Sequence, residues 1–226
     1  MNSCKFIINF ATNKNLSGKH YMKKILLTIA LAAISAFAIS APKTHDGFFL
    51  NATMGAGYSS FEDKIEGGLG KITCDGGAFE ASFKLGGTIY PNLILHFTFI
   101  GNAIYSDLEF KAGRDEESLE HDGFNMLMLG GGLTYYVVPE QNIYASASFG
   151  ITDISISLNS NSYNFDNLDA GFGFNITVGK EWWLNDENAL GVAFSFSHHS
   201  ADGNYRGEKN EASSNSFSIV ASYTFN

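Results

Sequence analysis

Residues 216–226 read SFSIVASYTFN, and this stretch at the end of the chain decides the fold. Phe217, Ile219, Ala221, Tyr223 and Phe225 alternate with smaller residues, most of which carry a hydroxyl group. A period of two places the two sets on opposite faces of a β-strand. The stretch therefore predicts a strand whose two faces meet different environments.

The same alternation recurs seven more times from residue 47 onward. The composition agrees, because 24 Gly and 20 Phe with only 3 Pro favour a β protein over a helical bundle. In the fifth run the phase slips, which predicts a β-bulge near Asp153. Apolar members of the seven earlier runs include Phe48, Leu50 and Met54; Phe79, Phe83 and Leu85; Leu93, Leu95 and Phe97; Leu127, Leu129 and Leu133; Ala147, Phe149 and Ile151; Phe172, Phe174 and Ile176; Leu190, Val192 and Phe194.

The connections between the runs alternate strictly between short and long. The short ones are Tyr90 to Asn92, Val138 to Asn142 and Leu184 to Asn188; the long ones span about 60–76, 106–122, 158–167 and 201–214. Short periplasmic turns alternating with long outer loops are typical of outer-membrane barrels. The sequence thus predicts an all-β, eight-stranded, antiparallel, up-and-down transmembrane β-barrel with both termini on the short-turn side.

The alternative is a soluble eight-stranded barrel, which packs its large apolar side chains inward. The interior of eight strands has room only for side chains. The small polar set fits inside, so we expect the Phe-rich set to face lipid. Aromatic residues cluster near both ends of the runs, as interfacial girdles do: Tyr90, Tyr135, Tyr136, Tyr144, Trp182, Trp183, Tyr223 and Phe225 near the short turns, and Tyr58, Tyr105, Phe124 and Tyr205 near the long loops.

The N-terminal region is predicted to direct secretion. Lys23 and Lys24 precede an apolar run, so residues 22–41 form a signal peptide with cleavage near Ala38 or Ser40. Residues 1–21 are either an upstream extension or a long charged leader, and residues 42–226 form the barrel. Removal of residues 1–41 leaves 9 Lys and Arg against 23 Asp and Glu, a net charge of −14. Nucleic-acid binding, which needs basic patches, is not expected.

The polar face carries charges that need partners if they are buried. Glu80 and Lys84 share this face and are expected to form one internal network with Glu181, and His96 belongs to the same polar core. This predicts a filled interior and makes a narrow channel the third choice of function. Cys74 is the single cysteine after the signal peptide, so no internal disulfide is expected.

The chain resembles the small outer-membrane barrel superfamily, which includes the transmembrane domain of OmpA and the OmpX-type proteins. The resemblance rests on the architecture and on a last strand that ends in Tyr223, Thr224 and Phe225, although Asn226 follows where many members end on the aromatic residue. It implies an outer-membrane location with periplasmic termini and extracellular loops, and a monomer. The implied partners are outer-membrane lipids including lipopolysaccharide, the barrel-assembly machinery, and a host or surface ligand of the loops.

The loop at 106–122 is rich in acids, among them Asp107, Glu109, Asp115 and Glu116. Their spacing matches no Ca²⁺ loop, so the sequence predicts neither a metal site nor a cofactor. A solvated acidic loop is the first interpretation, and bridging by divalent cations to anionic lipid headgroups is the alternative.

One cluster has the residue types of an active site. His198 and Ser200 are two residues apart, share the parity of the lipid-facing set, and precede Glu211 on the next run. Such a set can supply a base, a nucleophile and an orienting acid. The cluster resembles the His-x-Ser motif of the outer-membrane lipid A 3-O-deacylases, which implies Ser200 as nucleophile, His198 as base and Glu211, or less well Glu208, as the acid. Ala201 replaces the Asn usual after that Ser.

Two functions therefore stand side by side. The first is a structural or surface-interaction role carried by four outer loops, without enzymatic activity. The second is a lipid A acyl-ester hydrolase. If the strand ends by His198, His198 and Ser200 are ordinary residues of the barrel rim.

Overall fold

A computed structural model describes residues 43–65, 70–105, 108–112, 115–119, 123–158, 161–164, 169–205 and 208–226. The predicted extension at 1–21 and signal peptide at 22–41 lie outside these residues, so both stay predictions. The compact unit that contains all described residues spans Ile39–Asn226.

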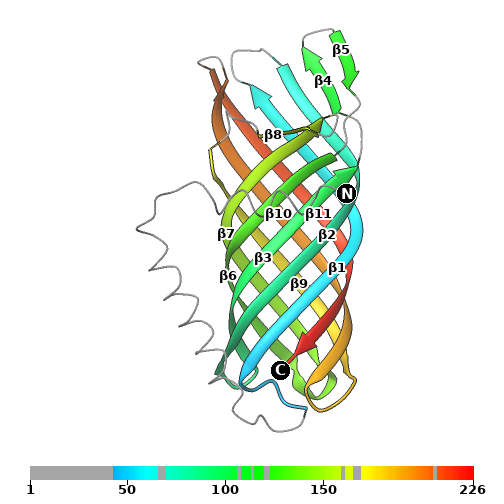
Figure 1. Cartoon of the computed structure of the whole chain (residues 1–226), viewed down its shortest axis with the longest axis vertical. Coiled ribbons are helices and arrows are strands. Elements are labelled where there is room, and N and C mark those ends of the chain that lie inside the picture. The colour runs from blue at the N-terminus through cyan, green and yellow to red at the C-terminus, as the bar shows by residue number, and fades with distance from the viewer. Residues whose placement is uncertain are drawn as a thin grey trace. The chain divides into compact units, whose positions relative to one another are not determined.

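Eight long antiparallel strands form a closed barrel (Figure 1). Each pairs with its neighbours along the chain, and β1 pairs with both β2 and β11, which closes the sheet. The predicted eight-stranded up-and-down architecture is thereby confirmed. The strands are β1 (Phe48–Ile65), β2 (Gly70–Tyr90), β3 (Leu93–Tyr105), β6 (Gly123–Val138), β7 (Ile143–Leu158), β9 (Gly171–Trp183), β10 (Asn188–Tyr205) and β11 (Glu208–Phe225).

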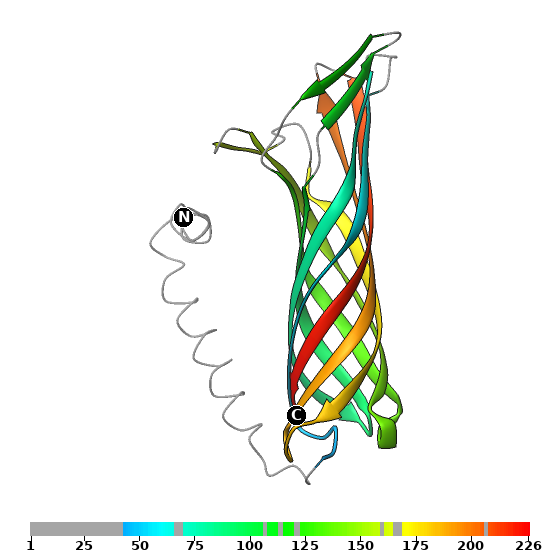
Figure 2. The same ribbon diagram turned by 90° about the vertical axis from the view of Figure 1, so that its right-hand side faces the viewer.

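Three short strands lie at the end of the barrel opposite the C-terminus (Figure 2). They are β4 (Leu108–Ala112), β5 (Asp115–Leu119) and β8 (Asn161–Asn164); β4 pairs with β2 and β5, and β8 pairs with β7. We call this end the hairpin end and the opposite one the short-turn end. The long β1–β2 and β10–β11 hairpins run well into the segments 60–76 and 201–214, which the sequence predicted as loops.

The three short connections lie where the sequence placed them. Pro91 and Asn92 join β2 to β3, a 3₁₀ turn (Pro139–Gln141) precedes β7, and residues 184–187 join β9 to β10. Asn92 and Asn142 take the left-handed conformation, at φ 62° and 52°, which Asn tolerates better than most residues. No helix in the described part of the chain is long and apolar enough to cross a membrane.

The bulge predicted near Asp153 is wrong. The β6–β7 pairing runs without a shift from Gly123 to Tyr136, and the irregularities lie at 136/138 and at 88/90, next to the short turns. Ile154 has the parity of the interior set because its side chain lies inside the barrel, where it is 3% exposed.

A continuous belt of large apolar side chains covers the outside of the barrel. Phe97, Phe149, Phe194 and Ile219 are each half or more exposed, as lipid-facing residues are in the absence of lipid. The belt ends in exposed aromatic residues on both sides: Tyr90, Tyr135, Trp182 and Tyr223 at the short-turn end, Tyr58 and Tyr105 at the hairpin end. Tyr136 and Tyr144, which we predicted in the girdle, are buried inside, while Phe124 and Tyr205 have no described side chains.

Polar side chains fill the middle of the interior, as predicted. The Lys84 ammonium donates to Ser146 Oγ at 2.9 Å and lies in the electrostatic field of Glu80 and Glu181. Glu181 accepts hydrogen bonds from Tyr136 at 2.9 Å and from Thr224 at 2.5 Å.

The interior also holds His96 where the sequence placed it. Its two ring nitrogens lie 2.8 Å from Thr98 Oγ1 and 3.0 Å from Thr134 Oγ1. All of these side chains are buried, so the predicted network that fills the lumen is confirmed.

Two apolar clusters, which the sequence did not predict, close the interior on either side of the polar layer. At the hairpin end the inward residues include one of these clusters beside buried polar residues such as Asp63, while outward ones such as Glu62, Lys64 and Glu211 are polar. A polar outward face is the pattern of a barrel wall in water. The clusters are Phe61, Cys74, Ile104, Met126, Ile154, Ala201 and Ala212 at the hairpin end, and Phe49, Ile94, Tyr136, Tyr144, Ala193 and Val220 toward the short turns.

Candidate functional site

The candidate residues His198 and Ser200 lie within β10, which continues to Tyr205. The alternative that the strand ends by His198 is therefore wrong. In a β-strand residues two apart share a face, and neither side chain is buried, unlike that of His199 between them, which is 0% exposed. Both side chains belong to the outer wall of the barrel.

The outer wall can be followed as register rows that cross β9, β10, β11 and β1. The last two apolar rows are Val178, Phe194, Ile219 and Ala56, followed by Ile176, Phe196, Phe217 and Tyr58. The next two rows toward the hairpin end are Phe174, His198, Asn215 and Ser60, followed by Phe172, Ser200, Ser213 and Glu62. On β10, β11 and β1 the wall thus changes from apolar to polar within one row.

His198 stands at this boundary and is held from two sides. Its Nδ1 lies 2.9 Å from Oδ1 of Asn215, the residue opposite it on β11. Its ring lies 5.4 Å from the ring of Phe174 on β9. When Nδ1 carries the proton, it donates to the amide oxygen and Nε2 keeps a free lone pair. In that tautomer Nε2 is the ring nitrogen that can accept a proton from a neighbouring hydroxyl.

Ser200 lies one row farther along the same wall. Its hydroxyl is 3.5 Å from the carbonyl oxygen of Phe172, at the limit of a hydrogen bond. Among the described residues no hydrogen bond joins Ser200 to His198. The strand brings the two side chains to one face, and the hydrogen bonds that the structure gives them go to other residues.

Glu211 lies away from His198. It is opposite Asp202 on β10 and Lys64 on β1, four residues along β11 from Asn215. Its side chain is exposed, and the side chain of Glu208 lies outside the described residues. The group that contacts the imidazole is thus the amide of Asn215 and not the carboxylate of Glu211.

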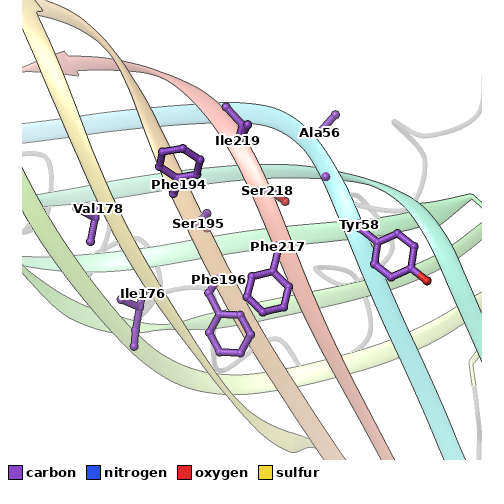
Figure 3. A pocket seen from close by; sticks show the side chains of 11 residues that line it. Ala56, Tyr58, Ile176, Val178, Phe194, Ser195, Phe196, Phe217, Ser218 and Ile219 are labelled. Carbon is purple, nitrogen blue, oxygen red and sulfur yellow. The ribbon is translucent and has the colours of Figure 1, made fainter.

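An apolar hollow of about 580 Å³ lies on the outer wall of β9, β10, β11 and β1 (Figure 3), and the row of His198 follows the rows that line it. The rings of Phe196 and Phe217 form one wall, with 4.7 Å between their centroids. The floor lies at Gly57, which has no side chain, and at Ser195 and Ser218, whose side chains are buried inside the barrel. The residues that line the hollow belong to the last two apolar rows. The polar row that contains His198 is the next one toward the hairpin end.

Sequence reasoning missed Asn215 and the hollow. Asn215 has the parity of Phe217, which marks it as outward-facing, but only the register of β10 against β11 sets it opposite His198. The hollow depends on side chains from four strands, none of which is a motif by itself.

No protein-family model and no curated protein matches the chain. Solved structures similar to it include Neisserial surface protein A, with a TM-score of 0.49 and 11% identity over 83% of this chain and 99% of that one. The outer membrane protein OprG from Pseudomonas aeruginosa gives a TM-score of 0.46 and 12% identity, over 82% and 99%. The outer membrane protein AlkL in lipid bilayers gives 0.42 and 14%, over 84% and 94%. The barrel itself is established by the strand pairing of this chain, and these likenesses add nothing about its function.

Proposed function

We propose that this chain is a closed outer-membrane barrel that acts at its outer surface and not by transport through its lumen. The observation that carries the proposal is the filled interior. Side chains from all eight long strands occupy it, with a buried charged network between two apolar clusters. The interior of an eight-stranded barrel has no room for a channel beyond such side chains. What remains for function is the outer wall and the loops and hairpins beyond it.

The orientation of the barrel follows from the same physics. The long hairpins and the short strands β4, β5 and β8 share one end, and bacterial barrels place their long connections outside the cell. The hairpin end is therefore proposed to face the medium, with the short turns and the C-terminus in the periplasm.

A labelling experiment on intact cells tests the orientation. In a Cys74→Ser background, Lys64→Cys puts an exposed thiol at the hairpin end and Glu140→Cys puts one in a short turn. A membrane-impermeant maleimide is expected to label the first variant and to leave the second unlabelled until the cells are lysed. If intact cells label Glu140→Cys and do not label Lys64→Cys, the proposed orientation is reversed.

Planar-bilayer recordings test the closed lumen. The folded wild-type barrel, identified by its heat-dependent shift on gels, is expected to give no stable conductance steps. Steady single-channel conductance from that same preparation would contradict the proposal and support a channel.

A second candidate function is an acyl-ester hydrolase that acts on an outer-membrane lipid such as lipid A. The observation that favours it is the His198 imidazole, held on the lipid-facing wall by Asn215 beside Ser200. In this reaction the Ser200 oxygen attacks the ester carbonyl and His198 takes the hydroxyl proton. His198 then returns the proton to the departing alkoxide, and water cleaves the resulting acyl-serine ester. Glu211, implied by the family resemblance, would reach this site only after a change in the β10–β11 register.

Mass spectra of lipid A from expressing cells test the hydrolase. Loss of one acyl chain with the wild type and its absence with Ser200→Ala are expected if Ser200 is the nucleophile. Ser213→Ala, which removes a hydroxyl from the facing position on β11, serves as the matched control and is expected to behave as the wild type. Identical spectra for cells with wild type, cells with Ser200→Ala and cells without the protein would exclude this activity.

A further inference from the structure

One pair of neighbouring strands in the barrel is joined by no chain connection at either end. Every other pair of long strands is consecutive along the chain, whereas β1 and β11 are the first and the last. We call the β1–β11 pair the seam, and its residue pairs run from Leu50–Phe225 to Ile65–Asn210. Strand ends that no turn joins separate more readily, because no loop limits the distance between them. The seam is therefore the place where the barrel should open first.

A short segment before β1 crosses the short-turn end of the barrel (Figure 2). We call this segment, residues 43–47, the strap. The Thr88 hydroxyl of β2 donates to the His45 carbonyl oxygen at 2.7 Å. The His45 ring is buried, stacks on Tyr136 of β6, and lies 5.2 Å from the ring of Trp183 of β9. The strap thus contacts strands on different sides of the barrel and is held in place across its end.

The strap and the end of β11 both bind the turn between β9 and β10. The Lys43 amide donates to the carbonyl oxygen of Asp186 at 2.8 Å. The Asn226 amide donates to the carbonyl oxygen of Glu187 at 2.9 Å. Two consecutive carbonyl groups of one turn therefore hold the backbone from the two sides of the seam. We call these two hydrogen bonds the clasp.

The turn that carries the clasp is itself braced. Asn185 Oδ1 accepts hydrogen bonds from the backbone amides of Glu187 and Asn188, at 3.0 and 2.8 Å, and from the side-chain amide of Asn188 at 2.9 Å. An Asn side chain that accepts from the backbone two residues later fixes the turn locally. Asn188 also accepts a hydrogen bond from the Tyr223 hydroxyl of β11. A fixed turn loses less conformational entropy when its carbonyl groups bind the two amides.

We propose that the clasp is a lock on the β1–β11 seam, which replaces the covalent turn that joins each other pair of strands. While it is closed, the seam cannot fray at the short-turn end without the loss of both hydrogen bonds to the β9–β10 turn. When it opens, the first residue pairs of the seam separate and water reaches the lower part of the filled lumen. The lock forms only after β1 and β11 lie side by side. It depends neither on the orientation proposed above nor on any reaction at Ser200.

Hydrogen exchange of the folded barrel in lipid nanodiscs, read by mass spectrometry, tests the lock. The double variant Lys43→Pro, Asn226→Pro removes both N–H donors, and a Pro ring cannot take the φ of 56° found at Lys43. The matched control Lys43→Gly, Asn226→Ala keeps both N–H groups. In the Pro variant we expect about tenfold faster exchange in the seam pairs from Leu50–Phe225 to Thr53–Ser222, as the loss of two backbone hydrogen bonds predicts. The control is expected to exchange as the wild type does.

The β6–β7 pair supplies the internal reference, because the turn at Pro139–Gln141 joins it at the same end. Its pairs from Leu133–Ala147 to Tyr136–Tyr144 are expected to exchange at the wild-type rate in both variants. Unchanged exchange at the seam would overturn the lock, and so would an equal increase in the two strand pairs, which indicates a general loss of stability. If the double Pro variant does not form the heat-modifiable barrel, Lys43→Pro alone is measured against Lys43→Gly. The expected increase at the seam is then about threefold, and the same two outcomes would overturn the lock.

Discussion

Nδ1 of His198 lies 2.9 Å from Oδ1 of Asn215 across the β10–β11 pair, on the outer wall of the barrel. The contact holds an imidazole at the boundary between an apolar belt and a polar rim, where a ring without a partner would be free to rotate. An amide oxygen in this position fixes the tautomer of the imidazole without adding a charge. A buried or lipid-facing carboxylate would carry a larger desolvation cost in the same place.

The first prediction concerns this contact. If His198 acts as a base on a lipid ester, Asn215→Ala removes the group that orients the ring, and the rate of acyl release is expected to fall by about tenfold or more. The measurement is the rate at which purified protein releases fatty acid from lipid A in mixed micelles.

Asn215→Asp restores an acceptor at the same position and is expected to recover much of that rate. Glu211→Gln is the informative comparison, because the structure places Glu211 away from the imidazole. A large loss in Glu211→Gln with none in Asn215→Ala would show that the active pairing of β10 and β11 differs from the one described here.

The second prediction concerns the buried charges in the lumen. Lys84→Met leaves Glu80 and Glu181 without the cation that faces them, and removal of one partner from a buried charged group costs about 3–5 kcal/mol. We expect a loss of this size in the free energy of unfolding, measured by urea denaturation in lipid vesicles.

Replacement of Glu80 together with Lys84 should restore part of the lost stability. In that double variant Glu181 is the one remaining member of these three buried ionisable groups. The variant Lys84→Met, Glu80→Gln is therefore expected to be more stable than Lys84→Met alone. Lys64→Met at the exposed rim is the matched control and should change stability by less than about 1 kcal/mol. Equal stability of wild type and Lys84→Met would show that Lys84 does not compensate these acids.

The third prediction concerns His45, which precedes β1 and closes the short-turn end. Its ring stacks on Tyr136 with 3.3 Å between centroids, and Nε2 lies 3.1 Å from Asn142 Oδ1. Burial lowers the pKa of His45 to about 4, although Asn142, Asn226 and Asp46 act in the opposite direction. The open state of this segment has an ordinary His pKa of about 6.5 and binds the proton more readily. Docking is therefore fully stable above about pH 6.5 and weakens as the pH falls toward 4, by at most about 3 kcal/mol.

Hydrogen exchange of the Thr88 amide reports this docking, because that amide donates to the Gly47 carbonyl oxygen at 2.9 Å. Its protection is expected to fall between pH 6.5 and 4, after correction for the intrinsic rate. In His45→Gln the side chain cannot take up a proton, so the corrected protection should be independent of pH over this range. A pH-dependent loss of the same size in His45→Gln would assign the effect to another group.

The fourth prediction compares two neighbouring glycines on β6. A Cβ on Gly130 would lie 1.8 Å from the carbonyl oxygen of Phe149, whereas a Cβ on Gly131 has its nearest neighbour at 3.4 Å. Gly130→Leu must push β6 and β7 apart, so we expect a loss of more than about 3 kcal/mol or failure to form the heat-modifiable barrel. Gly131→Leu adds an apolar side chain to the exposed face and should fold as the wild type does. Equal folding of the two variants would contradict the close approach of the strands.

Much of this protein follows from the alternation of its residues. Because side chains on a strand point to opposite sides in turn, runs such as Phe217 to Phe225 identify the lipid-facing set without further information. The order of short and long connections then gives the number of strands and their pairing. Glu80, Lys84, Glu181 and His96 could be placed inside for the same reason, since charges and hydroxyls on one face must meet each other there.

The tertiary structure alone decided what depends on register and on height along the barrel. Asn215 and Glu211 have the same parity, so the sequence could not choose between them as the partner of His198; the pairing of β10 with β11 did. Tyr58 and Phe61 lie three residues apart on β1. The side chain of Tyr58 belongs to the apolar outer wall, whereas that of Phe61 belongs to an apolar cluster inside the barrel. The sequence determined which residues share a face, because that requires only the local geometry of a strand. Which of them meet across strands, and where the lipid ends, is set by the stagger of eight strands closing on one another.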